Sequence, residues 1–167
     1  DTDTDSDTDT DTDSDTDTDV PSPLIIDHTC TDLSAVPAQW IDAARETFRV
    51  GYSHTSHGSQ LVTGIDAIRG DEGDPYHFTK TAWGLHPGVF LNDKAFNDWA
   101  ADLGHDGSLT WRDATITGLA HEDCDRNVVI WSWCGGVSDN DAQGIDTYLL
   151  AMDELEETYP EVIFVYM

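Results

Sequence analysis

The sequence is poor in basic residues. Lys and Arg number 7 against 34 Asp and Glu, which gives a formal net charge of −27. Binding to nucleic acid or to anionic lipid headgroups depends on clustered Lys and Arg that neutralise phosphate. The composition therefore predicts that this chain has no nucleic-acid partner and no attraction to an anionic membrane surface.

Long hydrophobic runs are missing as well. No segment approaches the roughly 18 apolar residues that a membrane-spanning helix requires. The sequence therefore predicts no membrane insertion.

Cysteine is also scarce. The chain has three, Cys30, Cys124 and Cys134, and no two of them have the C-x-x-C spacing of a zinc or redox site. Two interpretations stay open, namely free buried thiols or one disulfide with an unpaired remainder.

The acidic residues are unevenly distributed. The first 19 residues repeat the unit DTDTDSDT and hold ten Asp with no basic residue. The other 148 residues keep 24 acidic and 7 basic side chains, a net charge of −17. A segment without apolar side chains cannot offset the entropy lost on ordering. We therefore predict a disordered linker over residues 1–23 and a folded domain over residues 24–167.

Calcium binding is the alternative for the repeat, because EF-hand loops also alternate Asp. Those loops need a Gly at the sharp turn and a bidentate Glu at the end, and the repeat has neither. We interpret it as a solvated spacer of an exported protein, extracellular or at the cell surface. Such a spacer leaves room for a lipid anchor upstream.

Hydrophobic periodicity predicts the elements of the domain. The alternation of strand and helix over 128–167 is typical of a βαβ unit, so the predicted fold class is α/β with a mostly parallel sheet. Residues 70–107 are expected to be rich in loops. In the second helix we expect Leu61, Ile65 and Ile68 to form the buried stripe. The predicted helices are 37–48, 59–68, 111–119 and 141–159, and the predicted strands are 48–53, 128–133 and 162–167.

The last predicted strand runs to Met167 without a turn or a covering helix after it. Such an end would leave a sheet edge and an apolar face exposed. We therefore expect that the sequence is a fragment of a longer protein, open at both ends.

A turn rich in Gly, Ser and His follows the first predicted strand and contains His54, Ser56 and His57. Its hydroxyls suit the capping of a helix that begins near Ser59. The turn also suits a nucleophile, because a serine before a helix N-terminus lies where an oxyanion is stabilised. A metal site would need a third ligand, such as His28, His77 or His86, that the sequence does not place. We predict no metal and no cofactor.

The stretch VGYSHTSHGSQLVTGI resembles the first conserved block of the SGNH/GDSL hydrolase superfamily, more closely a divergent branch of exported bacterial proteins. The resemblance implies a three-layer, doubly wound, flavodoxin-like sandwich, incomplete at the C-terminus of this chain. It also implies that Ser56 is the nucleophile and that a backbone N–H near it stabilises the oxyanion.

Two later stretches resemble further blocks. LGHDGSLTW resembles the second block and implies an oxyanion role for the N–H of Gly107. VVIWSWCGG resembles the third block, where Cys134-Gly135-Gly136-Val137 replaces Gly-x-Asn-Asp and Gly135 falls in the oxyanion loop. Asn140 lies too far along the chain to replace the missing Asn. The fourth block, Asp-x-x-His, would follow Met167, so the general base is expected there, with His54 and His57 secondary.

The resemblance implies an exported serine esterase or acyl hydrolase whose partner is a small-molecule or carbohydrate ester, such as an acetylated carbohydrate. The alternative is a non-catalytic cell-surface or carbohydrate-binding module on the same fold. In that case aromatic side chains in loop-like sequence, Trp83 and Trp99, would form the sugar platform. Trp131 and Trp133 alternate on a predicted strand, so we expect at least one of them to be buried.

Overall fold

A computed structural model describes residues 25–96, 105–132 and 136–165 of the chain. The chain divides into two compact units, Asp1–Leu33 and Ser34–Met167. The linker predicted over 1–23 and the boundary after it lie outside the described residues. The described part of the first unit is exposed, and the side chain of Asp27 accepts hydrogen bonds from the amide and the hydroxyl of Thr29 there.

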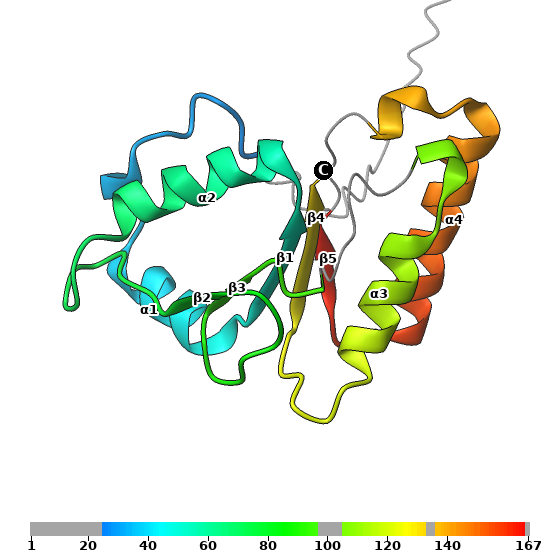
Figure 1. The fold of residues 1–167 in the computed structure, drawn as a ribbon. Helices are drawn as coiled ribbons and strands as arrows, with labels where there is room; N and C mark the ends of the chain where they lie inside the picture. Colours follow the sequence, from blue (N-terminus) through cyan, green and yellow to red (C-terminus); the bar gives the residue numbers. More distant parts are fainter. Residues whose placement is uncertain (1–24, 97–104, 133–135, 166–167) are drawn as a thin grey trace, which may run out of the picture. The chain divides into compact units, whose positions relative to one another are not determined.

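The second unit is built on a parallel β-sheet, which confirms the α/β class. Its described residues form five strands in the order β2-β3-β1-β4-β5, and each neighbouring pair is parallel (Figure 1). The strands are β1 (Val50–His54), β2 (Lys80–Ala82), β3 (Leu91–Asp93), β4 (Val128–Ser132) and β5 (Ile163–Val165).

All four predicted helices are present. The four α-helices of the described part are α1 (Ala38–Thr47), α2 (Ser56–Arg69), α3 (Thr110–Leu119) and α4 (Ala142–Thr158). Three short 3₁₀ helices accompany them, η1 (Leu33–Ala35), η2 (His105–Gly107) and η3 (Gly136–Asp139).

The prediction of loop over residues 70–107 was wrong for β2 and β3. Each of these strands has three residues, which is too short for an alternating pattern to be recognised in the sequence. Pairing with the neighbouring strand, which no local pattern encodes, makes them strands.

The predicted βαβ unit is confirmed by β4, α4 and β5. Helix α4 begins after Asp141, whose side chain accepts a 2.9 Å hydrogen bond from the amide of Gly144 and so caps the helix. The chain then returns to pair β5 beside β4 in parallel, with Val128 opposite Ile163. Strand β5 is one of the two edge strands of the described sheet, and its Ile163 is 52% exposed.

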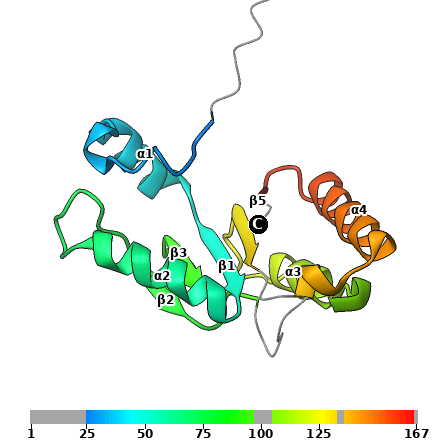
Figure 2. The same ribbon diagram turned by 90° about the horizontal axis from the view of Figure 1, so that it is seen from above.

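One hydrophobic cluster joins β4 to α3 and α4. Trp131 of β4 packs with Trp111 of α3 and Leu155 of α4, and these side chains are 5%, 0% and 1% exposed. Figures 1 and 2 show α3 and α4 side by side. The expectation that at least one of Trp131 and Trp133 is buried is confirmed by Trp131, while Trp133 lies outside the described residues.

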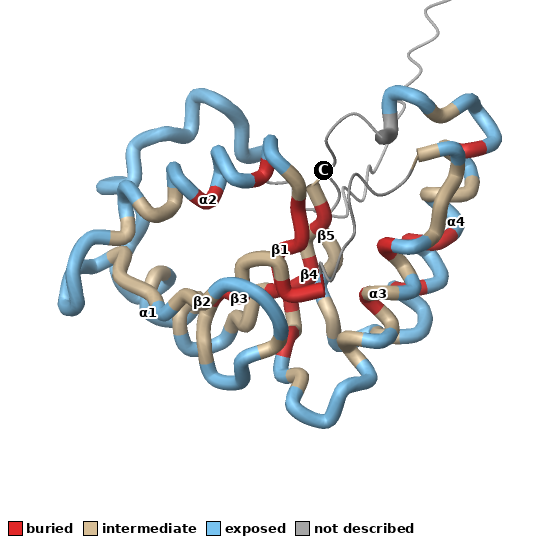
Figure 3. The backbone as a smooth tube through the Cα atoms, in the orientation of Figure 1, coloured by how far each residue is buried: buried red, intermediate tan, exposed pale blue. Residues whose placement is uncertain are grey.

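A second cluster joins β1 and β3 to α2. It consists of Tyr52, Val62 and Leu91, and Ile130 of β4 packs against it. Val129 and Trp131 belong to the other cluster, so alternate residues of β4 contribute to different clusters. Figure 3 shows the buried positions concentrated on β1 and β4.

The stripe predicted for α2 was wrong at Leu61 and Ile68, while Ile65 is half-buried. Leu61 and Ile68 are 46% and 47% exposed, whereas Gly58 and Val62 are buried. Residues four apart lie on one face of a helix, and the small Gly58 lets that face approach β1. The buried face is therefore rotated from the one that the largest apolar side chains indicate.

Candidate functional site

The predicted nucleophile turn lies where the central strand of the sheet ends. Strand β1 ends at His54, Thr55 follows in extended conformation, and α2 begins at Ser56, which is exposed. The prediction that the helix begins at Ser59 was therefore wrong by three residues. Ser56 is the first residue of α2, and Thr55 in the capping position makes no side-chain cap hydrogen bond.

Gly58 explains why the helix begins so close to the strand. An added Cβ at Gly58 would lie 2.3 Å from Cβ of His54 and 2.7 Å from Oη of Tyr52. Only a residue without a side chain allows the first turn of α2 to pack directly on the end of β1. This contact fixes the position of Ser56 at the carboxyl edge of the sheet.

His54 is a buried side chain whose two ring nitrogens both face oxygen atoms. Nδ1 lies 2.7 Å from the carbonyl oxygen of Thr55, and Nε2 lies 2.6 Å from Oδ1 of Asp93 in β3. A carbonyl oxygen can only accept, so Nδ1 carries a hydrogen. The His54 side chain is 1% exposed and that of Asp93 is 14% exposed, so this pair ties β1 to β3 below the turn.

These contacts bear on the secondary candidates for a general base. His54 could take a proton from Ser56 only after breaking one of its two bonds. His57 is exposed but directly follows Ser56 in α2, and side chains one residue apart on a helix do not face each other. In this arrangement His54 is held by Thr55 and Asp93, and His57 is the neighbour of Ser56 along the helix.

Tyr52 belongs to the same face of β1 as His54. The two rings lie 4.7 Å apart between centroids, and Tyr52 is 3% exposed. Burial raises the pKa of the Tyr52 phenol, the hydroxyl of Ser132 in β4 opposes the shift, and the charge of Asp93 adds to it. The phenol therefore stays neutral and fills the space under α2.

Gly107, predicted as an oxyanion donor, ends η2 with a φ of 71°. A tight turn with a glycine in the left-handed region therefore precedes α3. The amide of Gly107 donates a 2.6 Å hydrogen bond to Oδ1 of Asn140, so that N–H would have to leave Asn140 before it could bind an oxyanion. Asn140, which the sequence could not place, is thus brought to Gly107 by tertiary structure.

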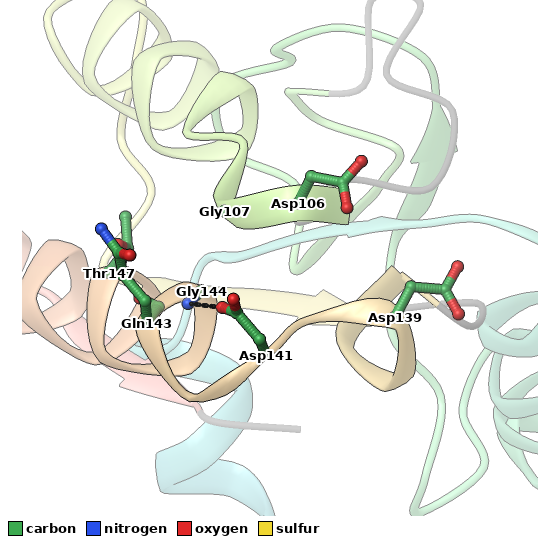
Figure 4. A pocket seen from close by; sticks show the side chains of 7 residues that line it. All are labelled: Asp106, Gly107, Asp139, Asp141, Gln143, Gly144 and Thr147. Atoms are coloured by element: carbon green, nitrogen blue, oxygen red, sulfur yellow. Dashed lines mark hydrogen bonds between the residues drawn. The ribbon is translucent and has the colours of Figure 1, made fainter.

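Gly107 also lines a cavity of about 370 Å³ (Figure 4). Its lining is polar and includes three acidic side chains, and it does not include Ser56. The structure therefore does not bring Gly107 and Ser56 together around this cavity. The lining residues are Asp106, Gly107, Asp139, Asp141, Gln143, Gly144 and Thr147.

Of the two residues predicted to form a sugar platform, the structure describes Trp83 and not Trp99. Trp83 is 59% exposed and directly follows β2. Trp99 lies outside the described residues, as does Gly135 of the predicted oxyanion loop.

Asp93 and Lys94 were missed by the sequence analysis. Both lie in the stretch that was predicted to be loop, and Asp93 ends a strand of only three residues. A run of three apolar residues, Val89, Phe90 and Leu91, before Asn92 and Asp93 is the sequence signal of a strand end there. That signal is too short to separate a strand from a turn.

The metal and thiol candidates can be followed in part. Among the described residues no group of three or more His, Cys, Asp or Glu side chains is arranged to hold a metal ion. Cys30 and Cys124 are free thiols, burial raises the pKa of the Cys124 thiol, and Cys134 lies outside the described residues. The sequence also predicted no membrane insertion. Within the part of the chain that the structure covers, no helix is both long enough and apolar enough to cross a bilayer.

Comparisons with family models, curated proteins and solved structures found no match to this chain. The function must therefore be argued from the geometry of the site.

Proposed function

We propose that this protein is an exported serine esterase of the SGNH type, with Ser56 as its nucleophile. The observation that carries the proposal is the position of Ser56, exposed at the first residue of α2 and two residues after the end of the central strand β1. The backbone N–H groups of a first helical turn have no partner within the helix and favour a developing negative charge.

The order of the strands also supports a ligand site next to Ser56. From β1 the chain passes through α2 to β2 on one side, and from β3 it passes through α3 to β4 on the other side of β1. In open parallel sheets, ligands bind outside the carboxyl ends of the strands where the order reverses in this way. Ser56 follows β1 at that point.

The proposal includes a three-layer, doubly wound arrangement of the domain. The two hydrophobic clusters support it, because Ile130 contributes to the cluster with α2 while Val129 and Trp131 contribute to the cluster with α3 and α4. Alternate residues of a strand point to opposite faces of a sheet. Helices on both faces are what a parallel sheet of buried strands requires.

The chemistry would run in two steps. Oγ of Ser56 attacks the ester carbonyl carbon while its proton passes to a general base, and the N–H groups of the first turn of α2 hold the tetrahedral oxyanion. The intermediate then releases the alcohol, which takes the proton back, and leaves an acyl group on Oγ. Water attacks the acyl group in the same way, the carboxylic acid leaves, and the proton returns from the base to Oγ of Ser56. Both nitrogens of His54 are engaged, so a different group would serve as the base.

The test compares the full-length protein with Ser56→Ala on p-nitrophenyl acetate. We expect the substitution to lower kcat/KM by at least about 10³-fold, because the nucleophile is removed. Ser59→Ala is the matched control, since Ser59 is an exposed serine of the same helix. Its kcat/KM should stay unchanged. Equal rates for the parent protein and Ser56→Ala would refute Ser56 as nucleophile.

Carbohydrate binding without catalysis is the second candidate, and the exposed indole of Trp83 favours it. In this case the full-length protein binds glycans and shows no turnover. A glycan-array signal that survives the double substitution Trp83→Ala and Trp99→Ala would contradict a platform at these residues.

A further inference from the structure

We propose that Trp83 and Lys94 form a subsite for an acidic saccharide, a sugar ring with a single negative charge. Trp83 is the first residue after β2, and Lys94 is the first residue after β3. Nζ of Lys94 lies 4.6 Å from the centroid of the Trp83 ring. The acidic saccharide would be a substrate only if the proposed esterase function holds. Its binding to the subsite does not depend on catalysis.

The charge of Lys94 is not used within the described part of the chain. Each of the other six Lys and Arg side chains there lies within 3.9 Å of an Asp or Glu oxygen. Lys94 has no such partner among those residues, and its contact is with an aromatic ring. An ammonium group over a ring keeps its N–H donors for another acceptor. In a chain of net charge −27 it is a local point of attraction for an anion.

The backbone holds both residues in an unusual conformation. The φ angle is 64° for Trp83 and 60° for Lys94. Both values lie in the left-handed region, which residues other than glycine rarely adopt. The amide of Trp83 donates to the carbonyl of Asp93 at 2.8 Å, and that of Lys94 donates to the carbonyl of Tyr52 at 2.6 Å. Strain that surrounding bonds maintain is characteristic of functional sites.

The subsite lies on the same edge of the sheet as the proposed nucleophile. The order β2-β3-β1 aligns Trp83, Lys94 and Ser56, each of which follows the carboxyl end of its strand. Neighbouring strands are about 4.8 Å apart, so a saccharide of a few rings can span from Trp83 to Ser56. One ring of the ligand would stack on the exposed indole of Trp83, with its negative group at Lys94.

A cavity of about 480 Å³ adjoins the pair and offers room for a further ring. This volume is within the range of small-molecule sites. The residues that directly follow Trp83 and Lys94 are part of its lining. These are Gly84, Leu85, Ala95 and Phe96. The carboxylate of Asp113, which also lines the cavity, is bound by Arg112 at 2.8 Å, so it does not face an anion alone.

The experiment measures binding by calorimetry in full-length protein carrying Ser56→Ala, so that no ester is turned over. The probes are a hexuronate tetrasaccharide, a sulfated hexose tetrasaccharide and the neutral tetrasaccharide of the same length. Uronate and sulfate present the same charge to Lys94, and these two arms identify which group the site prefers. We expect at least one acidic probe to bind about fivefold more tightly than the neutral probe.

Two variants measure the contributions of Lys94 and Trp83 to binding separately. Lys94→Gln should abolish the preference for acidic probes and leave the neutral affinity unchanged. Trp83→Asn should weaken all probes by about tenfold, and Asn tolerates a positive φ. Lys80→Gln is the matched control, because Lys80 is the other lysine and is paired with Asp66. It should leave binding unchanged.

Equal binding of acidic and neutral probes, binding of none, or a preference that survives Lys94→Gln would overturn the subsite. Ester hydrolysis is measured separately on the parent protein and on Ser56→Ala, so that failure of the subsite and failure of the proposed esterase can be told apart. If the acidic preference is present but Ser56→Ala does not change ester hydrolysis, the subsite stands and the proposed function fails. If turnover depends on Ser56 but the preference is absent, the esterase stands and the subsite fails.

Discussion

The indole Nε1 of Trp131 donates a 2.7 Å hydrogen bond to Oγ1 of Thr115, and both side chains are buried in the cluster between β4 and α3. Thr115 in turn donates from Oγ1 to the carbonyl of Trp111 at 2.8 Å. The hydroxyl thus serves as acceptor and donor at once, in a place that water does not reach. Burial of the large indole is compatible with the core only because its N–H has this partner.

Thr115→Val should lower the free energy of unfolding by about 1 to 3 kcal/mol, because the nearly isosteric valine leaves the buried N–H of Trp131 without an acceptor. Thr115→Ser keeps the hydroxyl and loses one methyl group, so its loss should be about 1 kcal/mol. Urea unfolding followed by tryptophan fluorescence measures both. A loss for Ser as large as that for Val would show that packing, and not the hydrogen bond, dominates.

Gly58→Ala should destabilise the domain by about 1 to 3 kcal/mol, because the new methyl group overlaps His54 and Tyr52 and forces α2 away from β1. Gly64→Ala is the matched control in the same helix. An added Cβ at Gly64 meets nothing within 4 Å, so alanine should stabilise the helix by about 0.5 to 1 kcal/mol. Thermal unfolding of the two variants gives the comparison, and two changes of the same sign would contradict the packing of α2 on β1.

Asp93→Ala should cost about 1 to 3 kcal/mol of unfolding free energy, since Nε2 of the buried His54 loses its partner. Asp93→Asn retains an oxygen acceptor and should cost less. Chemical denaturation ranks the variants, and the ¹⁵N signals of the His54 ring report whether Nε2 changes its hydrogen bonding. Equal losses for the two variants would mean that the acceptor at Asp93 is not what holds His54.

Asp125 provides a pH test. Partial loss of solvent around this exposed carboxyl raises its pKa, but the hydrogen bond from the amide of Gly88 and the contacts of Arg126 outweigh that effect and leave the pKa below its usual value. A carboxyl group with a lowered pKa in the folded state stabilises the fold above its unfolded pKa of about 3.9. That contribution is lost as the pH falls through the folded pKa.

The difference between the urea midpoints of the parent protein and Asp125→Asn should therefore be largest near pH 6, and it should shrink as the pH falls below about 3.9. Glu122→Gln is the control, because Glu122 is an exposed carboxylate in the same loop. Its effect should change little over this range. A difference for Asp125→Asn that is as large at pH 3 as at pH 6 would contradict the shift.

The sequence predicted the longer elements well. The period of apolar residues in α4 and the apolar run of β4 are local signals, and each element was confirmed close to its predicted bounds. Ser56 was also singled out, because the Gly, Ser and His residues that follow the first predicted strand are readable in the sequence, although the helix begins at Ser56 itself.

The candidate site was only partly predictable. Asp93 reaches His54 from 39 residues away, and Asn140 reaches Gly107 from 33 residues away. No local sequence pattern around either residue of these two pairs indicates its partner. The exposure of Trp83 was anticipated from its loop-like sequence, but the contact with Lys94 depends on the pairing of β2 with β3.

By itself the sequence determined the scarcity of basic residues, the acidic repeat, the α/β class and the place of Ser56 shortly after the first strand. Those features follow from composition and from periods of two and 3.6 residues, which are local. The tertiary structure decided which charges are paired, which face of α2 is buried and that Lys94 lies over Trp83. These depend on strand order and on contacts between distant segments, which no local period encodes.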